Sequence, residues 1–204
     1  MIFNRKAKSK VSRKHAGVQQ RAAFLETLEN RRLLAAWSLQ DQIIGLDKAT
    51  QNYPNITGAG ETVVLIDQGV DYNHPALGGG YGNKVITSWN FDTGSFDVFP
   101  YDNNAHGTGS AGEVAGSQRI VNGEIQQGVA PGVKLIALKA SGSYNVRQAF
   151  DWVVAHRSQY NIVGVNWVDP TGGSDSNVFL SELQTLSAQG VFVGGPTGDR
   201  KSVV

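Results

Sequence analysis

The chain has 204 residues, of which 40% are hydrophobic and 17% charged, with a formal net charge of +1 and no cysteine. This length and composition predict a globular domain with a sizeable core, and the lack of cysteine excludes disulfides, thiolate catalysis and cysteine-based zinc sites. No apolar run approaches the roughly 18 residues that a membrane-spanning helix needs. The 25 glycines favour tight strand–helix turns over a helical bundle.

Charge is distributed unevenly along the chain. Residues 1–34 hold nine basic and two acidic residues, a net of +7, whereas the remainder holds nine basic and fifteen acidic residues, a net of −6. A basic arm can bind nucleic acid or an anionic membrane, but this one lacks interleaved aromatic residues that stack on bases. We therefore expect residues 1–37 to be a basic, largely disordered leader with a short amphipathic helix within 18–37, and we expect no nucleic-acid partner.

The leader also contains a motif. Residues 28–35 read Leu-Glu-Asn-Arg-Arg-Leu-Leu-Ala, which resembles the Leu-Glu-x-Arg pattern with a Leu-Leu pair found near the N-termini of many large exported bacterial proteins. Glu26 and Glu29 interrupt the apolar stretch, so the segment differs from a standard secretory signal. The resemblance implies a bacterial protein that is secreted or held at the cell surface.

The first clear strand of the folded region lies at 62–66. Its β-branched and apolar run ends at Asp67, which predicts a buried strand with a carboxylate at the C-terminal edge of a sheet. Gly58 and Gly60 precede this strand and predict a turn. A dinucleotide-binding fingerprint needs its glycines after a strand and before a helix, so nucleotide binding is not expected.

A second informative stretch, 104–112, reads Asn-Ala-His-Gly-Thr-Gly-Ser-Ala-Gly. His106 stands at the head of a glycine-rich helix, and glycine costs such a helix up to about 1 kcal/mol per residue relative to alanine. Burial must offset this cost, so we expect the helix in the centre of the domain. A carboxylate and an imidazole are two members of a nucleophile-activating triad. Asp67 and His106 are therefore candidate catalytic residues.

The rest of the chain alternates strands with helices. Strands are predicted at 84–89, after Gly128, at 162–168 and at 191–193, and helices at 145–160 and 175–189. The predicted apolar faces of the two helices consist of Val146, Ala149, Phe150, Val153 and Val154 in the first, and Val178, Leu180, Leu183 and Leu186 in the second. Such alternation with short turns predicts an α/β domain, a parallel sheet flanked by helices in three layers with right-handed crossovers.

Both motif stretches resemble the first two signature motifs of the subtilisin-like serine proteases (subtilases, peptidase S8). The family reads Asp-x-x-His-Pro-Asp-Leu where this chain has residues 71–77, and His-Gly-Thr-His-Val-Ala-Gly where it has 106–112. The likeness covers roughly residues 38–199. It implies a subtilisin-like fold and a serine endopeptidase acting on peptide or protein substrates, in which Asp67 orients His106 and His106 is the general base.

Several positions depart from the family pattern. Gln68 replaces the usual Thr or Ser, and Gly109-Ser110 replace a His-Val pair. Ala76 stands where many subtilases have a carboxylate that binds structural calcium, so we expect no cofactor and no metal. The substrate-lining pattern Asn-x-Ser-x-Gly reads Asn-Trp-Val-Asp-Pro at 166–170, which loses the serine and places bulky groups at the peptide-binding cleft.

The oxyanion and nucleophile positions depart as well. Asp199 stands where the family has an oxyanion-donating Asn; a carboxylate repels an anion, and losing the donor alone costs about 10²–10³ in rate. The serine motif Gly-Thr-Ser-x-Ala/Pro does not occur in the sequence, and Ser141, Ser143 and Ser202 lack the strand–turn–helix context of a nucleophile. We therefore expect 38–204 to be a partial, C-terminally truncated subtilase-like catalytic domain, inactive alone.

Two interpretations remain open. The first is a serine endopeptidase whose serine lies on sequence outside this chain, as the intact Asp67 and His106 favour. The second is a catalytically inactive subtilase-like module with a structural or peptide-binding role at the cell surface, as Asp199 and the altered cleft favour.

Overall fold

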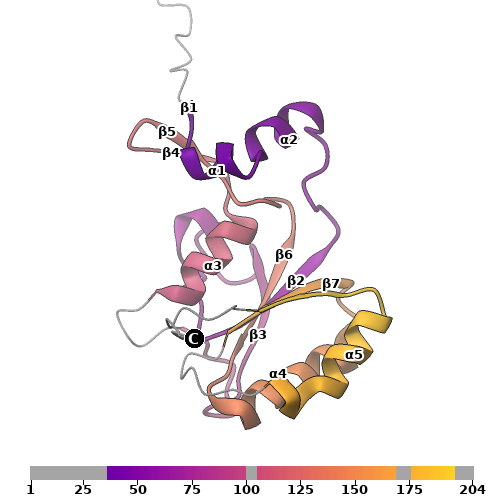
Figure 1. Ribbon diagram of the computed structural model, residues 1–204. Helices are drawn as coiled ribbons and strands as arrows, with labels where there is room; N and C mark the ends of the chain where they lie inside the picture. The colour runs from indigo at the N-terminus through magenta and orange to yellow at the C-terminus, as the bar shows by residue number, and fades with distance from the viewer. Residues whose placement is uncertain (1–35, 100–104, 169–175, 196–204) are drawn as a thin grey trace, which may run out of the picture. The chain divides into compact units, whose positions relative to one another are not determined.

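A five-stranded parallel sheet is the centre of the structure, a computed structural model that describes residues 36–99, 105–168 and 176–195 (Figure 1). The strands follow the order β3-β6-β2-β7-β8. Their bounds are Thr62–Asp67 (β2), Val85–Asn90 (β3), Lys134–Lys139 (β6), Ile162–Trp167 (β7) and Phe192–Gly194 (β8). The predicted α/β fold with a parallel sheet is thus confirmed.

Strand β2 is the middle strand of the five, with β6 and β7 as its neighbours. Its register with β6 runs without interruption from Thr62↔Lys134 to Asp67↔Lys139, and β7 pairs along its other edge. A strand enclosed by two neighbours and two helical layers needs apolar residues on both faces, and Val64, Leu65 and Ile66 are all buried. The strand has a polar residue at each end, Thr62 and Asp67, both buried, and Asp67 lies at the carboxyl end.

Helices cover both faces of the sheet. On one face lie α4 (Gly142–His156), the 3₁₀ turn η2 (Ser176–Phe179) and α5 (Leu180–Ala188), and on the other lie α3 (His106–Ala115) and the 3₁₀ turn η1 (Pro75–Leu77). Alternate residues of β2 face opposite layers: Val64 and Ile66 pack with α4 and α5, and Leu65 packs with α3. Asp67, next in alternation after Leu65, belongs to the α3 face.

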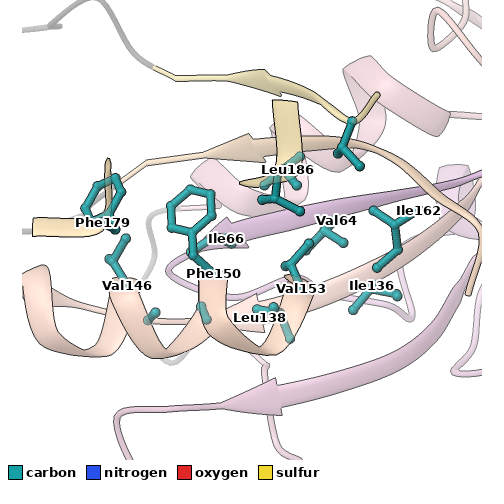
Figure 2. Packing of buried hydrophobic residues seen from close by; sticks show 14 residues of the cluster. Val64, Ile66, Ile136, Leu138, Val146, Phe150, Val153, Ile162, Phe179 and Leu186 are labelled. Atoms are coloured by element: carbon teal, nitrogen blue, oxygen red, sulfur yellow. The ribbon is translucent and has the colours of Figure 1, made fainter. Parts of the chain in front are cut away.

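The α4–α5 layer is held by an apolar cluster (Figure 2). The predicted inner face of α4 is confirmed, since Val146, Ala149, Phe150 and Val153 are fully buried. The predicted face of the second helix is wrong at its start: Val178 and Leu180 are 42% and 47% exposed, while Phe179 is fully buried and stacks on Phe150 with ring centroids 4.9 Å apart. The chain enters α5 through η2, whose tighter winding turns Phe179 inward.

Helix α3 lies against the sheet along one row of small residues. Gly107, Ala111 and Ala115, spaced four residues apart, are buried. A Cβ at Gly107 would collide with the backbone oxygen of Gly69 and lie 3.1 Å from Asp67, whereas a Cβ at Gly109 would meet nothing within 4 Å. The expectation that this glycine-rich helix is buried therefore holds for the face of α3 that packs against the sheet, and Gly109 lies outside that packed face.

Several short elements lie before β2 or between α3 and β6, and the sequence patterns did not predict them. They are a sheet of β1 (Ala36–Trp37), β5 (Glu124–Gln126) and β4 (Arg119–Val121), and the helices α1 (Leu39–Ile43) and α2 (Leu46–Asn52). Trp37 pairs with Ile125 in a strand, so the predicted leader helix does not extend to Trp37. The remainder of the predicted leader lies outside the described residues. Of the described helices, none combines the length and apolar character needed to cross a bilayer.

Candidate active site

The side chains of Asp67 and His106 meet at the carboxyl end of the sheet. Nδ1 of His106 lies 2.8 Å from Oδ2 of Asp67, and the backbone N–H of Gln68 donates to Oδ1 of Asp67 at 2.7 Å. The Asp67 side chain is 6% exposed and that of His106 is 44% exposed. The structure thus brings the two sequence-predicted residues together, one buried and one accessible.

Local structure explains why these side chains meet. Strand β2 ends at Asp67 and α3 begins at His106, so both side chains lie at the ends of regular elements. Gly107 lets the first turn of α3 approach the Asp67 backbone closely. Thr108 connects α3 to the segment that follows β2, because its Oγ1 accepts a hydrogen bond from the backbone N–H of Asp71 at 2.9 Å.

Burial dominates the electrostatics of Asp67. Desolvation raises the pKa of this carboxyl group, while hydrogen bonds from the Gln68 backbone, His106 and Ser110 act in the opposite direction. An ionised carboxylate only accepts hydrogen bonds, so the contact with His106 places the ring proton on Nδ1. The lone pair of Nε2 is then the proton acceptor, on a half-exposed ring that a hydroxyl group can reach.

Ser110 is a site residue that the sequence analysis did not assign. Its hydroxyl acts to lower the pKa of Asp67, although the sequence showed only that a serine stands where the family has an apolar residue. The signal was its spacing: Ser110 follows His106 by four residues, which places both on one side of a helix.

Ser141, which directly precedes α4, has a different role. Ser141 donates to Asp92 twice, from its backbone N–H at 2.8 Å and from Oγ at 2.9 Å. Asn145 donates to the same carboxylate at 2.9 Å. Asp92 therefore anchors the first turn of α4 to the segment after β3, and the hydroxyl of Ser141 is used in that anchor. Asp199 and Ser202 lie outside the described residues.

The predicted substrate-lining strand is β7, and its bulkiest residue faces away from the pair. Trp167 packs edge-on against Phe150 and Phe179, with centroid distances of 5.9 and 5.0 Å, in the α4–α5 layer. Of the bulky groups expected in the 166–170 stretch, Trp167 therefore lies in the α4–α5 layer, and 169–170 lie outside the described residues. The chain after β8 passes close to this indole: a Cβ at Gly195 would lie 2.9 Å from Cε2 of Trp167.

Strand alternation leaves Val168 as the changed residue on the Asp67 face of this segment. Its backbone N–H donates to the carbonyl oxygen of Ile66 at 2.9 Å, which continues the β2–β7 pairing. The predicted loss of a serine thus falls on a residue whose backbone remains paired with β2.

The turn at Ala76 does not fit a calcium ion. Ala76 is buried, and its backbone N–H donates to Nδ1 of His74 at 3.2 Å. Calcium requires several oxygen ligands, most often carboxylates, and Ala76 supplies only a methyl side chain. Within the described ranges, no group of three or more His, Asp or Glu side chains is placed to hold a metal ion.

A buried carboxylate hydrogen-bonded to an accessible imidazole at the carboxyl edge of a parallel sheet has the geometry of the Asp–His part of a nucleophile-activating triad. The sequence profile of the subtilase family, Peptidase S8, matches residues 58–184, which is more than half of the chain. The chain belongs to the subtilase family.

Individual relatives support the same assignment. Bacillopeptidase F of Bacillus subtilis is 38% identical over 111 residues, covering 48% of this chain and 8% of that protein. A subtilisin-like protease of Coccidioides posadasii is 33% identical over 156 residues, covering 73% of this chain and 36% of that protein. The solved structure of the S41 psychrophilic protease matches 76% of this chain and 52% of its own, with a TM-score of 0.58 and 25% identity. The chain therefore spans at most about a third of these curated relatives.

Proposed function

We propose that this chain supplies the Asp–His part of a serine endopeptidase, which hydrolyses peptide bonds when a serine hydroxyl is provided by sequence outside these 204 residues. The observation that supports the proposal is the 2.8 Å contact between Nδ1 of His106 and Oδ2 of Asp67. A surface ion pair does not need a buried carboxylate, whereas a triad does, because the buried charge must be directed at one ring nitrogen.

In this proposal each group has one role. Nε2 of His106 takes the proton of the serine hydroxyl as its oxygen attacks the peptide carbonyl carbon. Asp67 stays ionised and stabilises the imidazolium that results. His106 then returns the proton to the leaving amine, and a water molecule repeats the sequence on the acyl-enzyme.

A second candidate is an inactive subtilase-like module that binds peptides or has a structural role at the cell surface. Val168 favours it, because an apolar side chain replaces a hydroxyl on the strand segment beside the Asp67–His106 pair. Asp199 favours it for the charge reason given above, since a carboxylate opposes a developing oxyanion.

Labelling with a fluorophosphonate probe separates the two candidates. Two proteins are compared: the 204-residue chain and the longest contiguous coding sequence that contains it. The endopeptidase predicts a labelled serine in the longer protein only, with labelling lost in His106→Ala and Asp67→Asn. The control variant His156→Gln, which changes a histidine stacked on Trp152 in α4, retains labelling.

The outcomes are distinct. Labelling that survives His106→Ala contradicts the assigned base. Absence of labelling in both proteins, together with saturable binding of peptides, assigns the inactive module.

We also propose that the protein is exported from a bacterial cell and is secreted or cell-surface bound. The basic leader with its 28–35 motif supports this. The test is fractionation of cells that produce a C-terminally tagged chain with and without residues 1–34. Export predicts tag outside the cytoplasm only for the intact chain, and equal distribution of the two forms contradicts it.

A further inference from the structure

Two lysines lie side by side at the amino edge of the five-stranded sheet, opposite the edge that carries the candidate active site. Val85 of β3 pairs with Leu135 of β6, and Lys84 and Lys134 directly precede these two residues. The backbone N–H of Leu135 donates to the carbonyl oxygen of Lys84 at 2.8 Å, which continues the pairing to this end. Side chains at neighbouring paired positions leave a sheet on the same face, so the two ammonium groups extend from one face of the sheet.

Each ammonium group is fixed by the backbone beside the other lysine. Nζ of Lys84 donates to the carbonyl oxygen of Pro131, three residues before Lys134. Nζ of Lys134 donates to the carbonyl oxygen of Asn83, directly before Lys84, at 2.7 Å. These crossed contacts keep the two charges together. An ammonium group has three N–H donors, so each lysine keeps two N–H groups beyond its contact with the backbone.

In the part of the chain that the structure describes, no carboxylate forms an ion pair with either lysine. The two described ion pairs lie elsewhere, at the candidate active site and between α4 and α5. Glu61 is close in the backbone, since its carbonyl oxygen accepts from the N–H of Lys134 at 3.0 Å, but its carboxylate accepts from the side chain of Asn161 at 2.7 Å. Like charges at neighbouring positions of a sheet are destabilising, so this pair of charges favours a bound anion.

The electrostatics of Lys84 agree with this geometry. Partial burial and then the charge of Lys134 lower the pKa of the Lys84 ammonium group. Both causes act against its positive charge, and an anion beside the two ammonium groups would oppose both.

We propose that Lys84 and Lys134 form a binding site for a small oxyanion of the phosphate type. The free N–H groups of both lysines would donate charge-assisted hydrogen bonds to the anion, whose charge removes the repulsion between them. The bound anion would join the start of β3 to the start of β6. This site goes beyond the proposed endopeptidase, because it lies at the other edge of the sheet and uses neither Asp67 nor His106.

The test measures the melting temperature of the 204-residue chain by circular dichroism as inorganic phosphate replaces sodium chloride at constant ionic strength. Binding to the folded state stabilises it by mass action, so the melting temperature is expected to rise and then to saturate. In Lys84→Gln and in Lys134→Gln, the phosphate concentration that gives half of this rise is expected to increase about tenfold or more, the effect of one hydrogen bond to a charged group. The control Lys48→Gln, at an exposed site in α2, is expected to respond as the wild type does.

A charge reversal separates anion binding from a purely structural role of the lysines. Lys134→Glu gives Lys84 an attractive neighbour in place of a repulsive one, so the saturable response to phosphate is expected to be lost. General stabilisation by phosphate salts acts on all variants alike, and the rise that remains in Lys134→Glu measures it. A wild-type response that does not saturate, or one that is the same in Lys134→Glu and in Lys48→Gln, overturns the proposal and leaves the lysines only their contacts with the backbone.

Discussion

Adding one methyl group at Gly107 tests the close approach on which the site depends. In Gly107→Ala the new Cβ would collide with the backbone oxygen of Gly69 and press on Asp67. A backbone group cannot rotate away, so the chain must shift, and such overpacking costs about 1–3 kcal/mol. Gly109→Ala is a matched control, because its Cβ meets nothing within 4 Å.

Comparing the two variants isolates the collision. Both gain up to about 1 kcal/mol from the higher helix propensity of alanine, so their difference in unfolding free energy is the steric cost, about 1–3 kcal/mol. Urea denaturation followed by circular dichroism measures it. The ring signals of His106 are expected to shift in Gly107→Ala and to stay in Gly109→Ala. Equal stability with unchanged His106 signals would refute the packing described for α3.

The remaining predictions concern the core, pH and ligands. Phe179→Ala, which removes a fully buried ring stacked on Phe150, is expected to cost about 3–5 kcal/mol, and Val178→Ala at a partly exposed site below about 1 kcal/mol, both by urea denaturation. Slight desolvation and then the charge of Glu182 raise the pKa of the exposed Asp151 carboxyl group. The folded state therefore holds this proton more tightly than the unfolded state, so the stabilising contribution of Asp151 is present at low pH and is lost as pH rises through the folded-state pKa. Asp151→Asn is expected to remove this pH-dependent loss of unfolding free energy, which for an exposed side chain is below about 1 kcal/mol. A variant whose urea midpoint depends on pH as the wild type does would contradict the prediction. A calcium chelator is expected to leave the melting temperature unchanged, since bound calcium would raise it by mass action. The chain is expected to pass through a DNA column at about 0.15 M salt, and retention that falls steeply with salt would contradict this.

The central elements could be predicted because their patterns reflect burial on known faces. The run of apolar residues before Asp67 has the composition of a strand covered on both sides, and the buried face of α4 follows its helical period. The start of α5 did not follow, because a 3₁₀ turn precedes it and changes which residue points inward. The spacing of apolar residues over the whole segment 175–189 does not show where the 3₁₀ turn ends and the α-helix begins.

The β4–β5 hairpin was missed although its signal was present. Asn122-Gly123 connects the two strands with positive φ angles of 51° and 85°, which is typical of the Asn-Gly turns that join paired strands. The flanking strands have only three residues each, so their alternation is too short to be recognised.

The candidate site was predictable for the two residues that belong to motifs and less so for their neighbours. Asp67 and His106 were found from their places at a strand end and a helix start, and their catalytic role stays a prediction. The direction of Trp167 is decided by strand alternation relative to the buried layers, which requires knowing which layer each face meets. The oxyanion position of Asp199 and a serine supplied by sequence outside this chain also stay predictions.

The contact between Trp167 and Gly195 has a consequence for how this family member can vary. An indole at one position leaves room only for a residue without a side chain at the other. The effects of substitutions at 167 and 195 on the free energy of unfolding are therefore expected to be non-additive. A smaller side chain at 167 makes a larger residue at 195 tolerable, whereas a larger residue introduced at 195 first is destabilising. Evolution along this segment is thus constrained to an order of substitution, in which the aromatic residue must change before the glycine.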